Sequence, residues 1–391
     1  MLRYMVSTCG TSILTNSIQT FPRRGDFRLL DLANSSEDEL SSEQKQWINE
    51  LEKYAGKNLE QLWTDGNVAE LRKTCAELNT IFGYYAPQYP DQRDLYLFLG
   101  TDTYVGRKTA TLLSDLFVRH GLQAELRVYP ELRTRSTDEF RRGIGKLFKE
   151  FTEQIPEWKK RGYQIVFQLS GGFKSFQGYM QSLGMFFADE ILYLFESSLD
   201  LVRIPCIPVK LENVIQEVIG EHLSSLRTLS IFECLDHSQP EYEEILRAFR
   251  DARTDLLVDI EDVDGCKMIS MTPWGRMCWE HEKPLLYSTE LLDPPITKIR
   301  YGVNFRKDAE KVCRSNQDRW RTLNERIDDF ARYLLCDRGS KMNRLDFKSC
   351  SKTRLPSTHE MDAWAESPGH RIFTHEENGV WVLDALDVGD H

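Results

Sequence analysis

Five apolar runs alternate with helical stretches over the first 205 residues, and this alternation limits the folds open to the chain. Each run is rich in aliphatic and aromatic residues, and several end in Gly, Ser or Thr. The runs cover residues 3–7, 94–100, 126–130, 163–172 and 190–197. A helical stretch such as 106–121 lies between two of them and ends in a glycine. The pattern predicts an α/β domain with a parallel, doubly wound sheet.

Three polar loops follow strands of this predicted sheet. They are Ser7–Ser12 (STCGTS), Gly100–Thr103 (GTDT) and Ser170–Lys174 (SGGFK). Ligands of doubly wound sheets bind beyond the carboxyl ends of the strands, where small residues let backbone N–H groups reach an anion. None of the loops matches the dinucleotide pattern G-x-G-x-x-G or the phosphate-loop pattern. We therefore expect a polar, anionic ligand that is not held by either motif.

Length and charge suggest several domains and one confined site for a polyanion. With 391 residues the chain is too long for a single ordinary core, so two or three domains are expected. The net charge of -11 argues against a protein that coats nucleic acid over its whole surface. Residues 298–354 nevertheless contain sixteen Lys and Arg against eight Asp and Glu. This local excess predicts a basic patch on an acidic body.

The remaining composition indicates a reduced protein without a membrane span. The nine cysteines form no C-x-x-C pair and no His/Cys cluster at metal-ligand spacing, so we expect free thiols and no metal. No run of eighteen apolar residues occurs, and the first residues lack a basic-then-apolar signal pattern. We expect a cytoplasmic protein that does not contact a membrane.

Residues 206–295 change character and predict a winged-helix linker domain. Helical patterns over 212–235 and 241–254 precede two short strands around Asp264-Gly265, a hairpin signal, and Pro273 suits a helix start. Helices followed by a hairpin suggest a winged helix. The acidic character of the segment favours a linker or dimerisation role at least as much as DNA binding. Asp293-Pro294-Pro295 is a rigid break and a predicted boundary.

Residues 296–391 predict a small α+β domain. A strand is expected within 296–304, followed by helices. In the second helix the apolar face steps by three and four residues through Trp320, Leu323, Ile327, Phe330 and Leu334. A basic segment over 341–354 comes next. Two apolar runs, 370–375 and 380–388, are joined through Asn378-Gly379, a strong hairpin signal.

The first 205 residues resemble the CARF domain, the Rossmann-like sensor of type III CRISPR systems. STCGTSILTN and LSGGFKSFQGYMQSLG carry the resemblance. It implies a homodimer that binds a cyclic oligoadenylate, preferably cyclic tetra-adenylate, across its two-fold axis, where ring and cleft share symmetry. Lysine and backbone amides suit the phosphates, and hydroxyls suit the 2′-OH groups. The implied contacts are Thr8, Gly10, Thr11, Ser12, Asn16, Asp102, Ser170, Gly171, Gly172, Phe173 and Lys174. Whether such a domain also cleaves its ligand stays open.

Residues 296–391 resemble the RelE family of mRNA interferases, mainly in GHRIFTHEENGVWVLDALDVGDH. The whole arrangement is similar to CARF–RelE fusions, the CRISPR-associated mRNA interferases. The resemblance implies a metal-independent endoribonuclease without a cofactor that cleaves mRNA in the ribosomal A site and shuts down translation. Arg371 takes the position of the family's transition-state clamp, and His391 that of its last catalytic residue, able to act as acid or base. Lys341, Arg344, Lys348, Lys352 and Arg354 would hold the RNA backbone.

The general base is open, because the chain departs from the family just before Arg371. The family has basic residues there, whereas this sequence has MDAWAE at 361–366. The Lys352/Arg354 segment, His359 or His370 are the alternatives, and the two histidines are also expected to contact RNA. Capture by the ribosomal stalk, or contact of the basic segment with rRNA, are two routes by which the A site would be reached.

Two other functions compete with this hypothesis. Arg354 and His359 spell R-x4-H, the motif of HEPN ribonucleases, but that motif sits on a helix and Pro356 would break one. A CARF-controlled winged-helix transcription regulator is the second alternative. It would need a basic recognition helix between 206 and 290, whereas the most helical parts there are acidic.

Overall fold

The computed structural model describes residues 2–23, 27–195, 200–205, 213–249, 254–263, 265–314, 316–335, 345–364 and 369–388. The chain forms two compact units, Met1–Lys210 and Leu211–His391. Each unit has its own sheets and its own buried core, and each is described by itself.

A six-stranded sheet of order β3-β2-β1-β4-β5-β6 organises the first unit. Its strands are β1 (Leu2–Thr8), β2 (Leu95–Gly100), β3 (Gln123–Val128), β4 (Tyr163–Gln168), β5 (Glu190–Leu194) and β6 (Leu201–Pro205). The first five run parallel, which confirms the predicted parallel sheet. The sixth pairs antiparallel with β5 and was not expected. The strand order reverses between β1 and β4, which makes this pair the topological switch point of the sheet.

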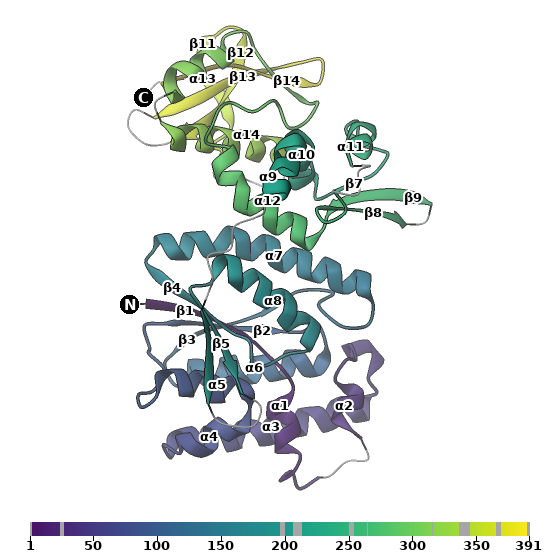
Figure 1. Cartoon of the computed structure of the whole chain (residues 1–391), viewed down its shortest axis with the longest axis vertical. Coiled ribbons are helices and arrows are strands. Elements are labelled where there is room, and N and C mark those ends of the chain that lie inside the picture. The colour runs from purple at the N-terminus through teal and green to yellow at the C-terminus, as the bar shows by residue number, and fades with distance from the viewer. Residues whose placement is uncertain are drawn as a thin grey trace. The chain divides into compact units, whose positions relative to one another are not determined.

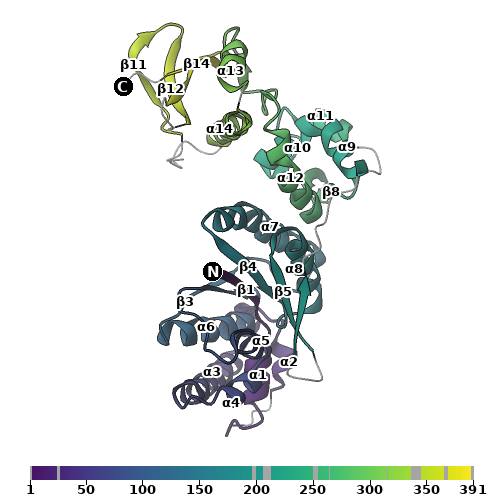
Figure 2. The ribbon, with the colours of Figure 1, turned by 60° about the vertical axis from the view of Figure 1, so that its left-hand side comes forward.

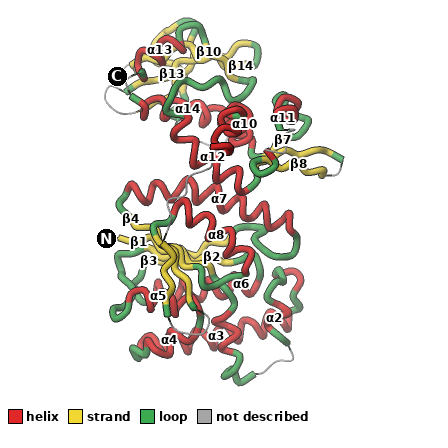
Figure 3. Tube along the Cα trace, viewed as in Figure 1, coloured by secondary structure: helices red, strands yellow, loops and turns green. Residues whose placement is uncertain are grey.

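Helices cover both faces of this sheet, as a doubly wound fold requires (Figures 1 and 3). The flanking helices are α6 (Tyr104–Arg119) on one face, and α7 (Thr137–Lys160) and α8 (Lys174–Phe187) on the other. The predicted helix over 106–121 is therefore confirmed. Its amphipathic pattern explains it, since Leu113, Leu116 and Phe117 are buried against the strands.

A helical region between β1 and β2 was not predicted. It contains α1 (Ser12–Ser17), α2 (Leu29–Leu32), a 3-10 turn (Glu37–Glu39), α3 (Ser42–Thr64), α4 (Val68–Thr74) and α5 (Ala76–Tyr85). Local sequence explains the long helix α3, because Ser41 and Gln44 form a capping box at its start. These helices pack onto the same core cluster as Met5, Phe98 and Val166 of the sheet.

The first part of the second unit combines helices with a three-stranded sheet of order β7-β9-β8. Its elements are α9 (Asn213–Glu221), α10 (Leu223–Phe232), β7 (Cys234–Leu235), α11 (Tyr242–Ala248), β8 (Val258–Val263), β9 (Cys266–Met271) and α12 (Pro273–Leu286). The β8–β9 hairpin and the helix that starts at Pro273 match the predicted elements. The assignment of these elements to a winged helix stays a prediction.

The second part of this unit is a five-stranded sheet of order β10-β14-β13-β12-β11 with two helices. Its elements are β10 (Ile299–Tyr301), α13 (Phe305–Cys313), α14 (Gln317–Leu335), β11 (Lys348–Arg354), β12 (Ser357–Trp364), β13 (His370–Glu377) and β14 (Val380–Val388). Asn378 and Gly379 turn the β13–β14 hairpin with positive φ, as their dipeptide predicts. α13 and α14 pack against one face of the sheet (Figure 2).

A buried ionic network joins the two parts of the second unit. Nε of Arg227, on α10, donates to Oδ1 of Asp328, on α14, at 2.7 Å, and the Arg227 side chain is only 1% exposed. Tyr287 donates to the other Asp328 oxygen at 2.6 Å. Burial opposes the charge of Arg227, but Asp328, together with Tyr287 and Tyr301, outweighs this effect, and the pKa of Arg227 rises. The network crosses the predicted boundary at residue 295, and the division into domains 206–295 and 296–391 stays a prediction.

Candidate functional site

The loops after β1 and β4 meet at the switch point of the first sheet. Oγ1 of Thr8 donates to the carbonyl oxygen of Gly171 at 2.6 Å. A Cβ added at Gly10 would lie 2.8 Å from the backbone nitrogen of Gly172, so the loops can approach this closely because residue 10 is a glycine. The two segments that carry the CARF resemblance are therefore adjacent in space, at the position where doubly wound sheets bind ligands.

Glu77 lies between these loops and was missed in the sequence. Its carboxylate, on the first turn of α5, accepts the backbone N–H of Gly10 at 2.6 Å and lies 3.4 Å from Oγ of Ser12. The Glu77 side chain is buried. Burial of the neighbouring Cys9 thiol, and then the charge of Glu77, raise the pKa of that thiol. An amide expected to face an anion is thus occupied by a carboxylate of the same chain. No local motif signals this contact, because 67 residues separate Gly10 from Glu77.

Several other predicted ligand contacts are hydrogen-bonded within the chain. Ser170 shares a 2.7 Å hydrogen bond with Thr80, and Asn16 donates to the carbonyl of Thr74 at 3.0 Å. Asp102 binds Arg107 and accepts the backbone N–H of Glu131 at 2.8 Å. Burial raises the pKa of Asp102, but these two donors outweigh it and the net shift is downward. Asp102 therefore also has a structural role in its loop.

The remaining predicted contacts lie at the starts of helices. Thr11 is the N-cap residue of α1, and Phe173 is the N-cap residue of α8. Phe173 packs against Phe140 and Phe176, and Lys174 is exposed at the first position of α8. Lys174 is thus the predicted contact that carries a positive charge at the surface.

Gln168 is a second feature that the sequence did not suggest. It is the last residue of β4, opposite Ser7 of β1, and it is fully buried. Neither its amide oxygen nor its amide nitrogen has a hydrogen-bond partner in the part of the chain that the structure describes. Since buried polar groups are normally paired, this amide marks the switch point as a place suited to a further polar partner.

In the second unit, side chains from β11 to β14 gather on the sheet face opposite α13 and α14, here called the open face. Residues two apart on a strand share a side, and a register shift between β13 and β14 at Phe373/Thr374 brings Asp384 to the same side as Asp387. The open face carries Arg354, Glu360, Asp362, Arg371, Phe373, His375, Asp384 and Asp387. Arg371 is central to it and only 12% exposed. Its guanidinium contacts Asp362 at 2.8 Å, Asp346 at 2.9 Å and Glu360 at 3.2 Å. The predicted clamp is therefore held by three carboxylates.

Next to Arg371, an arginine and a histidine complete the open face. The Arg354 guanidinium lies over the Phe373 ring, 4.0 Å from its centroid, and pairs with Asp387. Nδ1 of His375 lies 2.9 Å from Oδ2 of Asp384. His375 was not among the predicted site residues, although it stands two and four residues after Phe373 and Arg371 and so shares their face.

The other predicted RNA-site residues do not gather at one site. Lys348 pairs with Asp346, and Lys352 is exposed on the edge strand β11. His359 stacks on Phe347, on the side of the sheet that α14 covers. His370 is buried beside Trp364, so this imidazole does not suit direct contact with RNA. Lys341, Arg344 and His391 lie outside the described residues.

The R-x4-H motif is not helical. Arg354 ends β11 and Ser357 begins β12, so the motif spans a hairpin turn around Pro356. The HEPN alternative needs this motif on a helix, and a hairpin does not meet that requirement.

Among the described residues, no group of three or more His, Cys, Asp or Glu side chains suits a metal ion. No described helix is long and apolar enough to cross a membrane.

Residues 72–207 match the model of a CRISPR-associated protein family, Cas_APE2256. The match supports a CRISPR-associated protein. It covers the buried carboxylate of Glu77 and the loop after β4, but not the loop after β1. No curated protein matches the chain. Among solved structures, the chain is similar to protein VC1899 from Vibrio cholerae, with 9% identity over 72% of this chain and 69% of that one and a TM-score of 0.21.

Proposed function

We propose that this protein is a ribonuclease controlled by a cyclic oligoadenylate, and that it acts on mRNA in the ribosomal A site. The observation that carries the proposal is the open face, where a His–Asp pair and two guanidinium groups lie on the same side of one sheet. This combination suits metal-independent cleavage of RNA, which needs a base and fixed positive charge.

The proposed reaction uses the 2′-OH of the RNA as nucleophile. Because a carboxylate can only accept, Asp384 keeps the proton of His375 on Nδ1 and leaves Nε2 as the base. Nε2 takes the 2′-OH proton, O2′ bonds to phosphorus, and the bond from phosphorus to the 5′-oxygen breaks. The products are a 2′,3′-cyclic phosphate and a 5′-hydroxyl. The RelE resemblance assigns His391 as the donor of the proton to the leaving oxygen.

Arg371 and Arg354 supply the positive charge for the phosphorane. Each now contacts carboxylates or an aromatic ring of its own sheet. A phosphate would therefore have to exchange with Asp346 or Asp387, both of which are exposed at the rim of the open face. A guanidinium that changes partners in this way stabilises charge where the reaction develops it.

The ligand site of the first unit is proposed to control this chemistry. Its supports are the meeting of the β1 and β4 loops, the exposed Lys174 and the match to a CRISPR-associated family. A cyclic tetra-adenylate bound across a homodimer would favour one of two states. The Arg227–Asp328 network offers the second unit a rigid connection through which such a change can pass.

The test is an mRNA cleavage assay on programmed, translating ribosomes with a panel of cyclic oligoadenylates. Cleavage is expected with cyclic tetra-adenylate and not without it, and free RNA should hardly be cut. Arg371→Ala and His375→Gln should each lower the rate by roughly a hundredfold or more. His237→Ala, a substitution of an exposed histidine elsewhere in the second unit, is the matched control. Equal cutting of free RNA would contradict the ribosome-dependent mechanism.

A further inference from the structure

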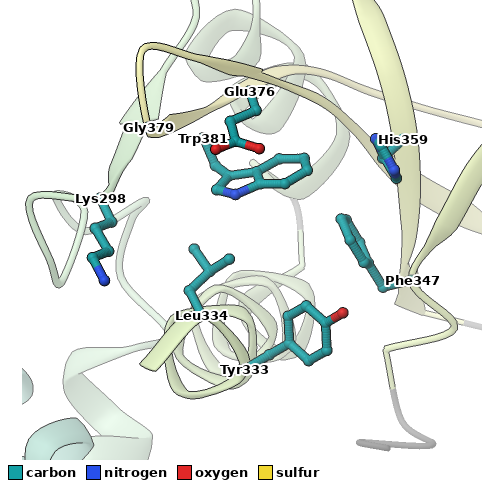
Figure 4. A pocket seen from close by; sticks show the side chains of 8 residues that line it. All are labelled: Lys298, Tyr333, Leu334, Phe347, His359, Glu376, Gly379 and Trp381. Carbon is teal, nitrogen blue, oxygen red and sulfur yellow. The ribbon is translucent and has the colours of Figure 1, made fainter. Parts of the chain in front are cut away.

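A hollow of about 460 Å³ opens at one end of the sheet face that α14 covers (Figure 4). Its walls come from α14, from the residues just before β10 and β11, and from β12, β13 and β14. The side chains that matter are Lys298, Tyr333, Phe347, His359, Glu376 and Trp381. The volume lies within the range of about 300–1,000 Å³ that small-molecule pockets show. The pocket is separate from the open face, since His359 and Glu360 are consecutive on β12 and point to opposite sides.

Flat aromatic rings form the pocket walls. Phe347 and His359 are stacked, with centroids 5.1 Å apart and planes inclined by 11°. The Trp381 ring stands edge-on to both, 5.3 Å from each centroid. Tyr333 lies 5.4 Å from Phe347. Tyr333, Phe347 and His359 are only half-buried, so part of their ring surface faces the hollow.

Two exposed charges of opposite sign flank these rings. Lys298 lies on one side of the hollow and the Glu376 carboxylate lies above the indole of Trp381, as Figure 4 shows. Neither charged group makes a hydrogen bond or an ion pair with another side chain of the described ranges. Nearby surface charges do pair, as Glu377 does with Arg300 at 2.6 Å. The pocket thus combines a stacking surface with a free donor and a free acceptor.

We propose that this pocket takes one unpaired nucleobase of an RNA strand. Single-stranded RNA is bound by stacking bases on aromatic rings and by hydrogen bonds to base edges, and both kinds of group are present. Glu376 would accept from a base amino group, and Lys298 would contact a base oxygen or phosphate. An apolar peptide side chain would fill the space but leave both charges unsatisfied.

The strand β11 links the pocket to the open face. It is the edge strand of the sheet, it follows directly after Phe347, and it carries Lys348 and Lys352 before ending at Arg354. An RNA that lies over this basic edge can place one nucleotide on the open face and another base in the pocket. The choice of RNA as occupant rests on the proposed function.

The experiment measures binding of a fluorescein-labelled, fully 2′-O-methylated RNA heptamer to the full chain by anisotropy. This probe cannot be cleaved through its 2′-oxygen, so binding is read whether or not the protein is a nuclease. A series with one abasic site at each position is compared on wild type and on Phe347→Leu, which keeps an apolar side chain but removes the ring. Glu376→Gln is compared with Glu377→Gln, its neighbour on the same strand.

In wild type, one abasic position should weaken binding roughly tenfold, the size of one stacked base. The same abasic site should not change the affinity of Phe347→Leu for the probe. Glu376→Gln should weaken binding of the intact probe, whereas Glu377→Gln should not. A folding defect cannot mimic the abasic result, because it would not depend on one position of the probe.

The proposal is overturned if no abasic position weakens binding of the probe. It is also overturned if an abasic site weakens binding equally in wild type and in Phe347→Leu, which is the result that a pocket for a peptide would give. Failure of the pocket and failure of the proposed function are distinguishable. A protein that cleaves RNA on ribosomes but shows no abasic effect disproves the pocket alone. A protein that shows the abasic effect without any cleavage disproves the nuclease alone.

Discussion

Nδ1 of His375 lies 2.9 Å from Oδ2 of Asp384, and that same oxygen accepts a hydrogen bond from Ser357 at 2.7 Å. The carboxylate is therefore held from β12 while it orients a ring on β13. Because Ser357 donates to Asp384 and not to the imidazole, this group is not a serine nucleophile with its base. It is an oriented imidazole whose second nitrogen is available for proton transfer.

Asp384→Asn should disable this imidazole while keeping the shape of the site. An amide can donate to Nδ1 and so favour the tautomer with its proton on Nε2, which cannot act as a base. We expect a rate of ribosome-dependent cleavage lowered about 10²- to 10⁴-fold, with binding of RNA unchanged. Single-turnover kinetics on programmed ribosomes with cyclic tetra-adenylate measure this, with His237→Ala as control. A wild-type rate in Asp384→Asn would remove His375 from the mechanism.

Asp346→Asn should make Arg371 more available to a phosphate. Asp346 is exposed and contacts the Arg371 guanidinium at 2.9 Å, so it competes directly with an RNA phosphate. Its loss should strengthen binding of a non-cleavable RNA by roughly twofold to fivefold, the size of an exposed ion pair. Fluorescence anisotropy measures the affinity, and Asp236→Asn, far from the open face in sequence, is the control. Weaker binding in the variant would show that Asp346 positions Arg371 and does not compete for it.

Asp346 should also make the free energy of unfolding depend on pH. Hydrogen bonds from Lys348 and Arg371 lower the pKa of Asp346 below its ordinary value. The contribution of Asp346 is therefore complete above the unfolded pKa of about 3.9 and is lost as the pH falls through the lower folded pKa. Urea unfolding of wild type and Asp346→Asn should show a gap at pH 7 that narrows towards about pH 3. A gap that stays constant over this range would mean that the carboxylate charge does not stabilise the fold.

Much of the architecture was predictable because its signals are local. Apolar runs that end in small residues predicted the parallel strands, and Asn378-Gly379 predicted the β13–β14 hairpin. Pro273 predicted the start of α12. The helices between β1 and β2 were missed, although Ser41 and Gln44 form a capping box. The strand β6 was missed too, because its five residues, LVRIP, contain a charged residue and a proline and form no long apolar run.

The site residues were less predictable, since contacts between distant segments decide them. Resemblance selected the loops around Gly10 and Gly171, and the fold brings these together. Glu77 could not be selected, because a glutamate in a helical stretch has no mark that distinguishes it from a surface residue. His375 was passed over for a related reason: which face of β13 stays open depends on where α13 and α14 pack. Pairing of Arg371 with three carboxylates likewise depends on strand register.

Glu77→Gln should strengthen the binding of cyclic tetra-adenylate to the first unit. The amide oxygen still accepts the N–H of Gly10, so the loop keeps its shape, but a buried negative charge beside the loops is removed. A ligand with four phosphates is repelled by that charge, and the repulsion is large in a poorly solvated site. We expect a gain in affinity of tenfold or more, and tenfold corresponds to about 1.4 kcal/mol of binding free energy. Isothermal titration calorimetry measures it, with Glu70→Gln on α4 as control. Loss of binding would instead make the Glu77 charge part of the recognition of the ligand.

Asp328→Asn should strongly destabilise the second unit, because it leaves Arg227 charged, 1% exposed and without its counter-ion. Breaking a buried ion pair from one side costs about 3–5 kcal/mol, whereas replacing both members with apolar residues of similar volume is often neutral. Arg227→Met combined with Asp328→Leu should therefore be more stable than Asp328→Asn alone. Urea unfolding of the full chain, followed by tryptophan fluorescence and circular dichroism, gives the free energies. Since the network joins α10 to α14, the second unit should lose its structure in one transition, and the variant should shift that transition as a whole. Two separate transitions within residues 211–391, of which only one moves, would show that the network does not couple the two parts and that ligand control must travel by another route.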